Sequence, residues 1–209
     1  RGGYAASAAA FALPDLGITT LTDMVDHARR MTSAITVPVI ADADTGYGEV
    51  PQVIHTVHEL ERAGVAAIQF EDQVFPKRCG HMEGKKVIPA EEMVVKVRAA
   101  LDARRNPETV IIARSDATAV TGLDDAIARS RMYADAGADV VFIDAPTSED
   151  DLKAIAAGGI NAVLMVNISE YGKTPDLGAQ RFEELGFGLV IYPSSTLFAA
   201  AQSTKELAA

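Results

Sequence analysis

The chain repeats one pattern of hydrophobic and polar positions: an amphipathic helix ends at a glycine, a short apolar strand follows, and the strand leads to a polar residue. In the clearest case, a helix over 51–63 has Pro51 in its first turn and stops at Gly64, and a strand over 66–70 leads to Glu71. The same pattern predicts further strands at 37–41, 109–113, 140–143, 162–166 and 189–191, and further helices at 21–33, 90–104, 123–136, 148–157 and 176–185.

Strands that are apolar on both faces and alternate with helices indicate an α/β protein with a parallel sheet, either open or closed into a barrel. The pattern predicts six strands, so an eight-stranded barrel needs two more, which we expect to precede Arg1. No linker or charge block interrupts the pattern, which favours a single catalytic domain over residues 1–209, incomplete at both ends. The longest loops, 44–50 and 72–89, follow acidic strand ends, on the side where barrels carry their chemistry.

Composition narrows the classes of function. With 209 residues, of which 48% are hydrophobic, the chain can bury a substantial core. A net charge of -10 argues against general binding to nucleic acid or membrane surfaces, which requires clustered positive charge. An anionic substrate stays compatible, because a bound cation or a local arginine reverses the potential within one cleft. The single cysteine cannot form an intramolecular disulfide, and no apolar run approaches the roughly 20 residues that span a bilayer, so we expect a cytoplasmic protein.

Acidic side chains gather where predicted strands end. Asp42 and Asp44 follow one strand, and Glu71 follows the next one along the chain. Carboxylates at the exit ends of neighbouring strands are typical ligands of hard cations such as Mg²⁺, which keeps several waters and takes few protein ligands. The alternative is that these carboxylates only cap turns.

The only cysteine, Cys79, lies in the loop after Glu71, among Lys77, Arg78 and His81. Cationic neighbours lower the pKa of a thiol and can prepare it for proton transfer near neutral pH. The alternative is a small buried hydrophobe, which free cysteines often are.

Arg114 ends the apolar strand at 109–113. A guanidinium at such a position either pairs with an internal carboxylate or binds an anionic ligand. Together with the carboxylates and the thiol, it indicates a metal-assisted enzyme site.

The order of these motifs resembles the isocitrate lyase and phosphoenolpyruvate mutase superfamily, in particular its methylisocitrate lyase-like and 2-alkylmalate (2,3-dimethylmalate) lyase-like branch. The resemblance covers essentially the whole chain. It is carried by the segments Leu13–Gly17, Asp42–Asp44, Glu71–Gln73, Lys77–His81, Ala113–Ala117 and Tyr192–Pro193. It implies a (β/α)8 TIM-type barrel whose first two strands are absent here, a Mg²⁺ cofactor with Mn²⁺ as an alternative, and a homotetramer that exchanges C-terminal helices.

The resemblance also assigns roles to individual residues. It implies that Asp42, Asp44 and Glu71 hold the metal, partly through water, and that Cys79 is the general acid, with Lys77 and His81 beside it. The residues that it implies for substrate binding are Gly2, Gly3, Asp15, Gly80, Arg114, Asp144, Asn167, Ser169 and Pro193. Turn formation is the alternative for Asn167 and Ser169, and helix capping is the alternative for Asp15. Asp144 stands where relatives usually carry glutamate, and the residues flanking Gly2 and Gly3 depart from the family pattern.

We therefore expect cleavage of a carbon–carbon bond in a 2-hydroxy polycarboxylate, giving an α-keto acid and a carboxylate. The base that removes the hydroxyl proton stays open between Tyr4, Asp15, Glu71 and a tyrosine upstream of Arg1. By spacing from Pro193, Phe198 occupies the place of a substrate-binding arginine of methylisocitrate lyases, which favours a 2-alkylmalate. The alternatives are an oxaloacetate decarboxylase, an enzyme like carboxyphosphonoenolpyruvate phosphonomutase, and a barrel that binds without catalysis.

Overall fold

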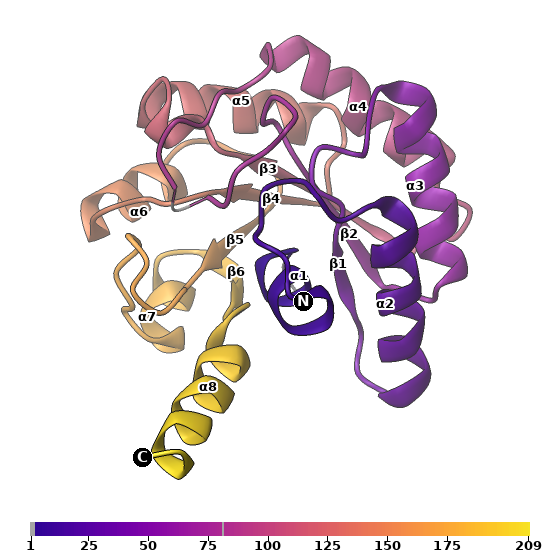
Figure 1. The fold of residues 1–209 in the computed structure, drawn as a ribbon. Helices are drawn as coiled ribbons and strands as arrows, with labels where there is room; N and C mark the ends of the chain where they lie inside the picture. Colours follow the sequence, from indigo (N-terminus) through magenta and orange to yellow (C-terminus); the bar gives the residue numbers. More distant parts are fainter. Residues whose placement is uncertain (1–2, 81) are drawn as a thin grey trace.

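Six parallel strands form one curved sheet in which spatial order follows chain order, in a computed structural model that describes residues 3–80 and 82–209 (Figure 1). The strands are β1 (Ile40–Asp42), β2 (Ala67–Glu71), β3 (Val110–Ser115), β4 (Val140–Ile143), β5 (Val163–Asn167) and β6 (Phe187–Ile191). Each of the six predicted strands is present, with bounds that match the prediction or differ from it by up to three residues. The α/β prediction with a parallel, barrel-type sheet is therefore confirmed.

Helices cover the outer, convex side of this sheet, while the first helix lies at its open side (Figure 1). The predicted helices are present as α2 (Leu21–Ala34), α3 (Val50–Arg62), α4 (Ala90–Ala103), α5 (Leu123–Asp135), α6 (Glu149–Ala156) and α7 (Ala179–Glu184). Two further helices, α1 (Gly3–Phe11) and α8 (Ser195–Leu207), and a 3₁₀ turn at Ala117–Ala119 were not predicted. Among the described residues, no helix is long and apolar enough to cross a membrane.

Local signals account for the ends of the predicted helices. Thr20 caps α2 by accepting a hydrogen bond from the Asp23 backbone N–H, while the Asp23 side chain accepts one from the Thr20 N–H. After α3, Gly64 adopts a φ of +82°, a conformation that glycine reaches without the steric cost of a side chain. The glycine that ended the predicted helix is therefore the residue at which the chain turns towards β2.

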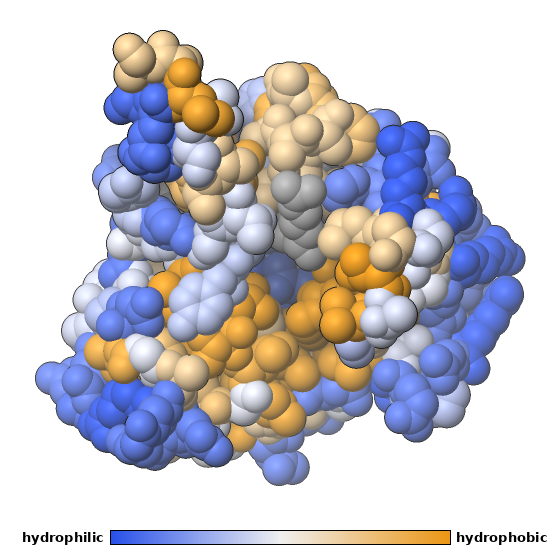
Figure 2. Space-filling view, turned by 90° about the horizontal axis from the view of Figure 1, so that it is seen from below, coloured by the Kyte–Doolittle hydropathy of each residue, from blue (hydrophilic) through white to orange (hydrophobic). Residues whose placement is uncertain are grey.

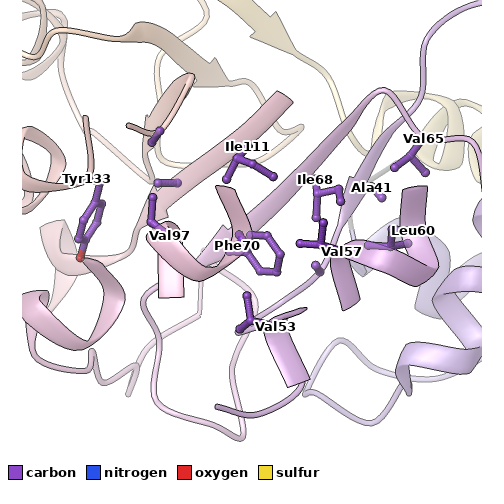
Figure 3. Packing of buried hydrophobic residues seen from close by; sticks show 14 of the residues in the cluster. Ala41, Val53, Val57, Leu60, Val65, Ile68, Phe70, Val97, Ile111 and Tyr133 are labelled. Atoms are coloured by element: carbon purple, nitrogen blue, oxygen red, sulfur yellow. The ribbon is translucent and has the colours of Figure 1, made fainter. Parts of the chain in front are cut away.

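Side chains of the strands alternate between two apolar layers. The outer layer packs Ile68, Phe70 and Ile111 of the sheet against helix residues such as Val53 and Val57 of α3 (Figure 3). A smaller inner layer contains only strand residues: Ala67, Ile112, Val140, Phe142 and Met165. Because successive side chains of a strand point to opposite faces, this alternation determines which residues at the strand ends face inward.

The strands β1 and β6 are the two edges of the sheet. The face seen from below is hollowed and largely apolar between polar margins (Figure 2). Two further strands between these edges would complete an eight-stranded barrel, and their existence stays a prediction.

Candidate active site

Five predicted site residues lie at the carboxyl ends of successive strands, at positions whose side chains face the inside of the sheet. Asp42 lies two residues after Ile40, and Glu71 two residues after Gln69, and both Ile40 and Gln69 line the interior. Arg114 follows Ile112 of the inner layer by two positions, as Asp144 follows Phe142 and Asn167 follows Met165. Parallel pairing then aligns the strand ends, with Glu71 opposite Arg114 across the β2–β3 pair. The period of the strands therefore gathers these five side chains at one end of the sheet.

A cavity of about 810 Å³ opens at that end of the sheet. Predicted site residues that line it are Gly3, Asp15, Asp42, Lys77, Cys79, Gly80, Arg114, Asp144, Asn167, Ser169 and Pro193. Asp44 and Glu71 are buried just outside its lining. Gly2 and His81 lie outside the described residues. Eleven of the predicted residues thus share one cavity, and its volume is ordinary for a small-molecule site.

Asp42 is held by backbone donors. Its carboxylate accepts hydrogen bonds from the N–H groups of Gly3, at 2.7 Å, and Asp44, at 3.1 Å. Burial alone would raise the pKa of Asp42, but the charges of Lys77 and Arg114 and these two donors together hold it below its usual value. Asp42 is therefore ionised, at the point where the first turn of α1 meets the strand ends.

Lys77 is the positive charge among the carboxylates near Asp42, a cluster that we call the acidic corner. Its Nζ lies 2.5 Å from Asp15 Oδ1 and 2.8 Å from Asp44 Oδ1. Burial would lower the pKa of Lys77, but Glu71, Asp44, Asp42 and Asp15 raise it overall, so the ammonium stays charged. Burial and the nearby Asp42 charge raise the pKa of Asp44 to about 6, against the opposing effect of Lys77.

Arg114 lies among carboxylates at the end of β3, next to the end of β2. Its Nε and Nη2 donate to the two oxygens of Asp116 at 2.8 and 2.9 Å, and Asp144 Oδ2 is 3.2 Å from Nη2. Glu71 Oε2 is 3.5 Å from Nη1, and the guanidinium carbon lies 5.2 Å from the centre of the Phe142 ring. Arg114 therefore pairs with internal carboxylates and also lines the cavity, and its binding of an anionic ligand stays a prediction.

Two acidic groups here have unsatisfied oxygens. Glu71 Oε1 and both carboxylate oxygens of Asp144 are buried without a hydrogen-bond partner among the described residues. Asp144 is only 1% exposed and lines the cavity. Burial raises the pKa of Glu71 well above its usual value, despite the nearby charge of Arg114. Such buried, poorly satisfied carboxylates are costly unless a ligand or cation engages them.

The residues present fit a hard divalent cation. Among the residues that the structure describes, the buried acids Asp15, Asp42, Asp44, Glu71, Asp116 and Asp144 surround three buried cations, Lys77, Lys85 and Arg114. Within residues 3–80 and 82–209, however, no three His, Cys, Asp or Glu side chains are grouped to ligate one ion. The arrangement therefore suits an ion such as Mg²⁺ that takes one or two carboxylates and keeps its remaining waters.

Several residues of this site were not predicted from the sequence. Asp116 bridges Arg114 and the buried Lys85, and the Gln73 side chain bonds to the backbone before Cys79. The spacing of Asp116 two positions after Arg114 offered a signal, since it continues the inward parity of β3. Lys85 and Gln73 lie in a loop without periodicity, so the pattern of the sequence carried no signal for either residue.

Comparison with known proteins agrees with this geometry. A family model described as phosphoenolpyruvate phosphomutase matches residues 3–209. The chain is 45% identical to 2,3-dimethylmalate lyase of Eubacterium barkeri over 205 residues, covering 98% of this chain and 71% of that protein. It is 48% identical to probable 2-methylisocitrate lyase 1 of Corynebacterium glutamicum over 190 residues, covering 91% of this chain and 62% of that protein.

Solved structures show the same fold. Oxaloacetate acetylhydrolase in complex with 3,3-difluorooxalacetate superposes with a TM-score of 0.93 at 36% identity, covering 98% of this chain and 70% of that chain. Phosphonopyruvate hydrolase in complex with oxalate and Mg²⁺ superposes with a TM-score of 0.86 at 31% identity, covering 98% of this chain and 71% of that chain. The parallel sheet, the strand-end cluster and these likenesses lead to one conclusion: the chain belongs to the phosphoenolpyruvate phosphomutase family, and its curated relatives include carbon–carbon lyases.

Proposed function

We propose that this chain carries the site of a Mg²⁺-dependent lyase that cleaves a 2-hydroxy polycarboxylate into an α-keto acid and a carboxylate. The observation that carries the proposal is one cavity lined by Asp42, Arg114 and Cys79, which offers a metal-binding acid, a carboxylate-binding cation and a proton donor. The relatives named as 2,3-dimethylmalate and 2-methylisocitrate lyases support it. Because the chain spans 71% and 62% of those two relatives, the activity of the whole protein is part of the proposal.

The metal would be held by Asp42 and, through water, by Asp44 and Glu71. A bound Mg²⁺ supplies positive charge where negative charge develops on the substrate oxygens. Phosphonopyruvate hydrolase, described with oxalate and Mg²⁺, supports this choice of ion, and Mn²⁺ has the same preference for oxygen ligands. The positively charged Lys77 keeps Asp44 and Asp15 in place beside this position.

Substrate carboxylates would be bound beside the metal position, at the ends of β3 and β5. Arg114 offers a guanidinium that lines the cavity, and Asn167 and Ser169 line it at the end of β5. Asp144 also lines the cavity, and its Oδ2, 3.2 Å from Arg114 Nη2, holds the guanidinium in orientation. A 2-hydroxy acid would thus be fixed by its carboxylate while its hydroxyl faces the acidic corner.

The cleavage requires two proton transfers. A base takes the proton of the 2-hydroxyl, the C2–C3 bond breaks, and the electron pair of that bond goes to C3 of the departing carboxylate. Cys79 then donates its proton to C3. Among the candidate bases, Tyr4 and Asp15 line the cavity and Glu71 does not, which favours the first two within the described residues.

An apolar rim favours an alkyl substituent on the substrate. Phe198, near the start of α8, lines the cavity and stacks on Tyr4 with ring centres 6.4 Å apart. Tyr171 meets the same ring edge-on at 5.8 Å. A third substrate carboxylate placed there would lack a charged partner, which costs about 2–5 kcal/mol. We therefore propose a 2-alkylmalate as the preferred substrate over 2-methylisocitrate.

A product-detected screen tests this proposal. The purified protein would be given 2-alkylmalates, 2-methylisocitrate, isocitrate, oxaloacetate and carboxyphosphonoenolpyruvate, each with Mg²⁺ and with a chelator. We expect an α-keto acid and a carboxylate from the 2-alkylmalate only when Mg²⁺ is present. Release of CO₂ or of a phosphonate instead would select the decarboxylase or the phosphonomutase, and unchanged turnover in chelator would refute the metal. A barrel that binds without catalysis predicts no product from any of them.

The matched variant for the metal is Asp42→Asn combined with Asp44→Asn, which keeps size and removes two charges. We expect it to lose turnover and to lose Mg²⁺ binding in calorimetry while the circular dichroism spectrum is unchanged.

Two further expectations belong to the proposal. We propose a homotetramer, which sedimentation can test, and a cytoplasmic location, supported by the single cysteine.

A further inference from the structure

Two buried polar side chains hold the backbone on either side of Cys79. Before it, the amide of Gln73 makes a double contact with one residue: Oε1 accepts from the Arg78 N–H at 3.0 Å, and Nε2 donates to the Arg78 carbonyl at 2.8 Å. Gln73 is 2% exposed. Both backbone groups of the residue that precedes the thiol are therefore satisfied by one rigid amide.

After Cys79, Lys85 holds the backbone carbonyl of Gly80. Its Nζ donates to Gly80 O at 2.5 Å and to Asp116 Oδ1 at 2.9 Å, and Asp144 Oδ2 lies 3.6 Å away. Lys85 is 8% exposed, and burying an ammonium costs free energy unless it is paired. The pairing spans two parts of the chain, because Asp116 directly follows β3 and Gly80 belongs to the loop.

Lys85 also links the loop that carries Cys79 to the guanidinium of Arg114. Asp116 accepts a hydrogen bond from Lys85 on Oδ1, and it accepts hydrogen bonds from Arg114 on both of its oxygens. On the other side of the peptide, the Gly80 Cα packs so closely on Asp144 and Arg114 that a side chain there would overlap both. A shift of the loop would therefore disturb Arg114, and a shift of Arg114 would disturb the loop.

We propose that Gln73 and Lys85 are positioning residues that fix the Cys79 thiol over the cavity, and that Lys85 couples this loop to Arg114 through Asp116. The proposal rests on the proposed function for the role of Cys79 as proton donor. The placement of the thiol itself does not depend on that role. Neither side chain needs to touch the substrate for this effect.

Nearly isosteric variants of the full protein test whether Gln73 and Lys85 hold the backbone around Cys79, an arrangement that we call the clamp. Gln73→Met and Lys85→Met remove the hydrogen bonds and retain length. Lys86→Met is the matched control, because Lys86 is the adjacent, exposed lysine of the same loop. The first readout is the rate of iodoacetamide alkylation at Cys79, followed by peptide mass spectrometry. The second readout is the separate measurement of kcat and KM on the preferred substrate.

We expect both variants to alkylate at Cys79 at least about threefold faster than the parent, because a released loop exposes the thiol. A reacting group displaced by about 1 Å can cost about 100-fold in rate, so kcat should fall by about 10- to 100-fold. KM should change less than kcat, and it should change more for Lys85→Met than for Gln73→Met, because only Lys85 is linked to the substrate-binding Arg114 through Asp116. Lys86→Met should match the parent in all of these quantities.

Alkylation and kcat within about twofold of the parent for both variants would overturn the proposal. If the parent shows no lyase activity, the alkylation rate still decides whether the clamp exists, so a failure of the proposed function is distinguished from a failure of this inference. Circular dichroism and the thermal midpoint report folding. Where a methionine variant does not fold, Gln73→Asn or Lys85→Arg is held to the same criteria.

Discussion

Replacing Gly80 by alanine should impair the site far more than it impairs the fold. A Cβ built on Gly80 would overlap the Asp144 carboxylate and Arg114 Nη2, and it would lie only 2.8 Å from Asp144 Cγ. Ordinary van der Waals contact begins at 3.4 Å. The new Cβ and Asp144 Cγ must therefore move apart by 0.6 Å, the difference between 3.4 and 2.8 Å, and the atoms that overlap must move further. Either the loop rises or the two side chains move, and both alternatives displace groups that line the cavity.

The size of the effect follows from this displacement. A misplacement of about 1 Å costs about 100-fold in rate, so kcat/KM should fall by about that factor. Overpacking of a buried position costs about 1–3 kcal/mol, which lowers the thermal midpoint but leaves a folded protein. The assay is steady-state kinetics on the preferred 2-alkylmalate, with calorimetric melting of the same sample.

The control is Met82→Ala, in the same loop, where the side chain is 44% exposed and its loss should leave kcat/KM unchanged. If Gly80→Ala retains activity within about threefold of the parent, the close packing of the loop on Asp144 and Arg114 is not needed for catalysis, and the reasoning is refuted.

Three further predictions concern single side chains. Cys79→Ser should reduce kcat by about 100- to 10,000-fold, the contribution of a positioned general acid, and a loss below about threefold would show that the thiol is not the donor. Phe198→Arg should shift the ratio of kcat/KM for 2-methylisocitrate over the 2-alkylmalate upward by at least about tenfold, and an unchanged ratio would contradict the assignment of the rim. Asp116 is buried, which alone would raise its pKa, but Arg114 and Lys85 hold it at about 2, below its ordinary 3.8. Because the folded-state pKa is the lower one, its stabilisation of about 2 kcal/mol is present above about pH 4 and lost towards pH 2. The difference in unfolding free energy between parent and Asp116→Asn should therefore narrow over that range in denaturant titrations, and a constant difference would contradict it.

The strands could be predicted from the sequence because each is a short apolar run between helices, and the predicted site residues stand where these runs end. The strand β3 is apolar on both faces, so its sequence indicates that Arg114 is at its end but not which face Arg114 is on; the structure shows Ile112 and Arg114 towards the interior and Ile111 and Ala113 towards the helices. The predicted strand stopped at residue 113, so the inward position of Asp116, two residues after Arg114, was not predicted.

Residues outside the periodic elements were less predictable. Gln73 and Lys85 act through contacts across the loop at 72–89, whose conformation depends on the strands below it rather than on its own sequence. The helix α1 is rich in alanine and has almost no amphipathic pattern, and α8 has no buried residue, so neither produced a periodic signal. The stacking of Phe198 on Tyr4 joins segments near the two ends of the chain, which no local pattern indicates.

The measurement that tests the account most directly is proton NMR of 2,3-dimethylmalate incubated with the protein and Mg²⁺ in D₂O. Cleavage of the C2–C3 bond followed by protonation from an exchanged thiol predicts equimolar pyruvate and propionate, with one deuterium at C2 of the propionate. A substrate that stays intact while 2-methylisocitrate is cleaved, or a product mixture without pyruvate, would contradict the account.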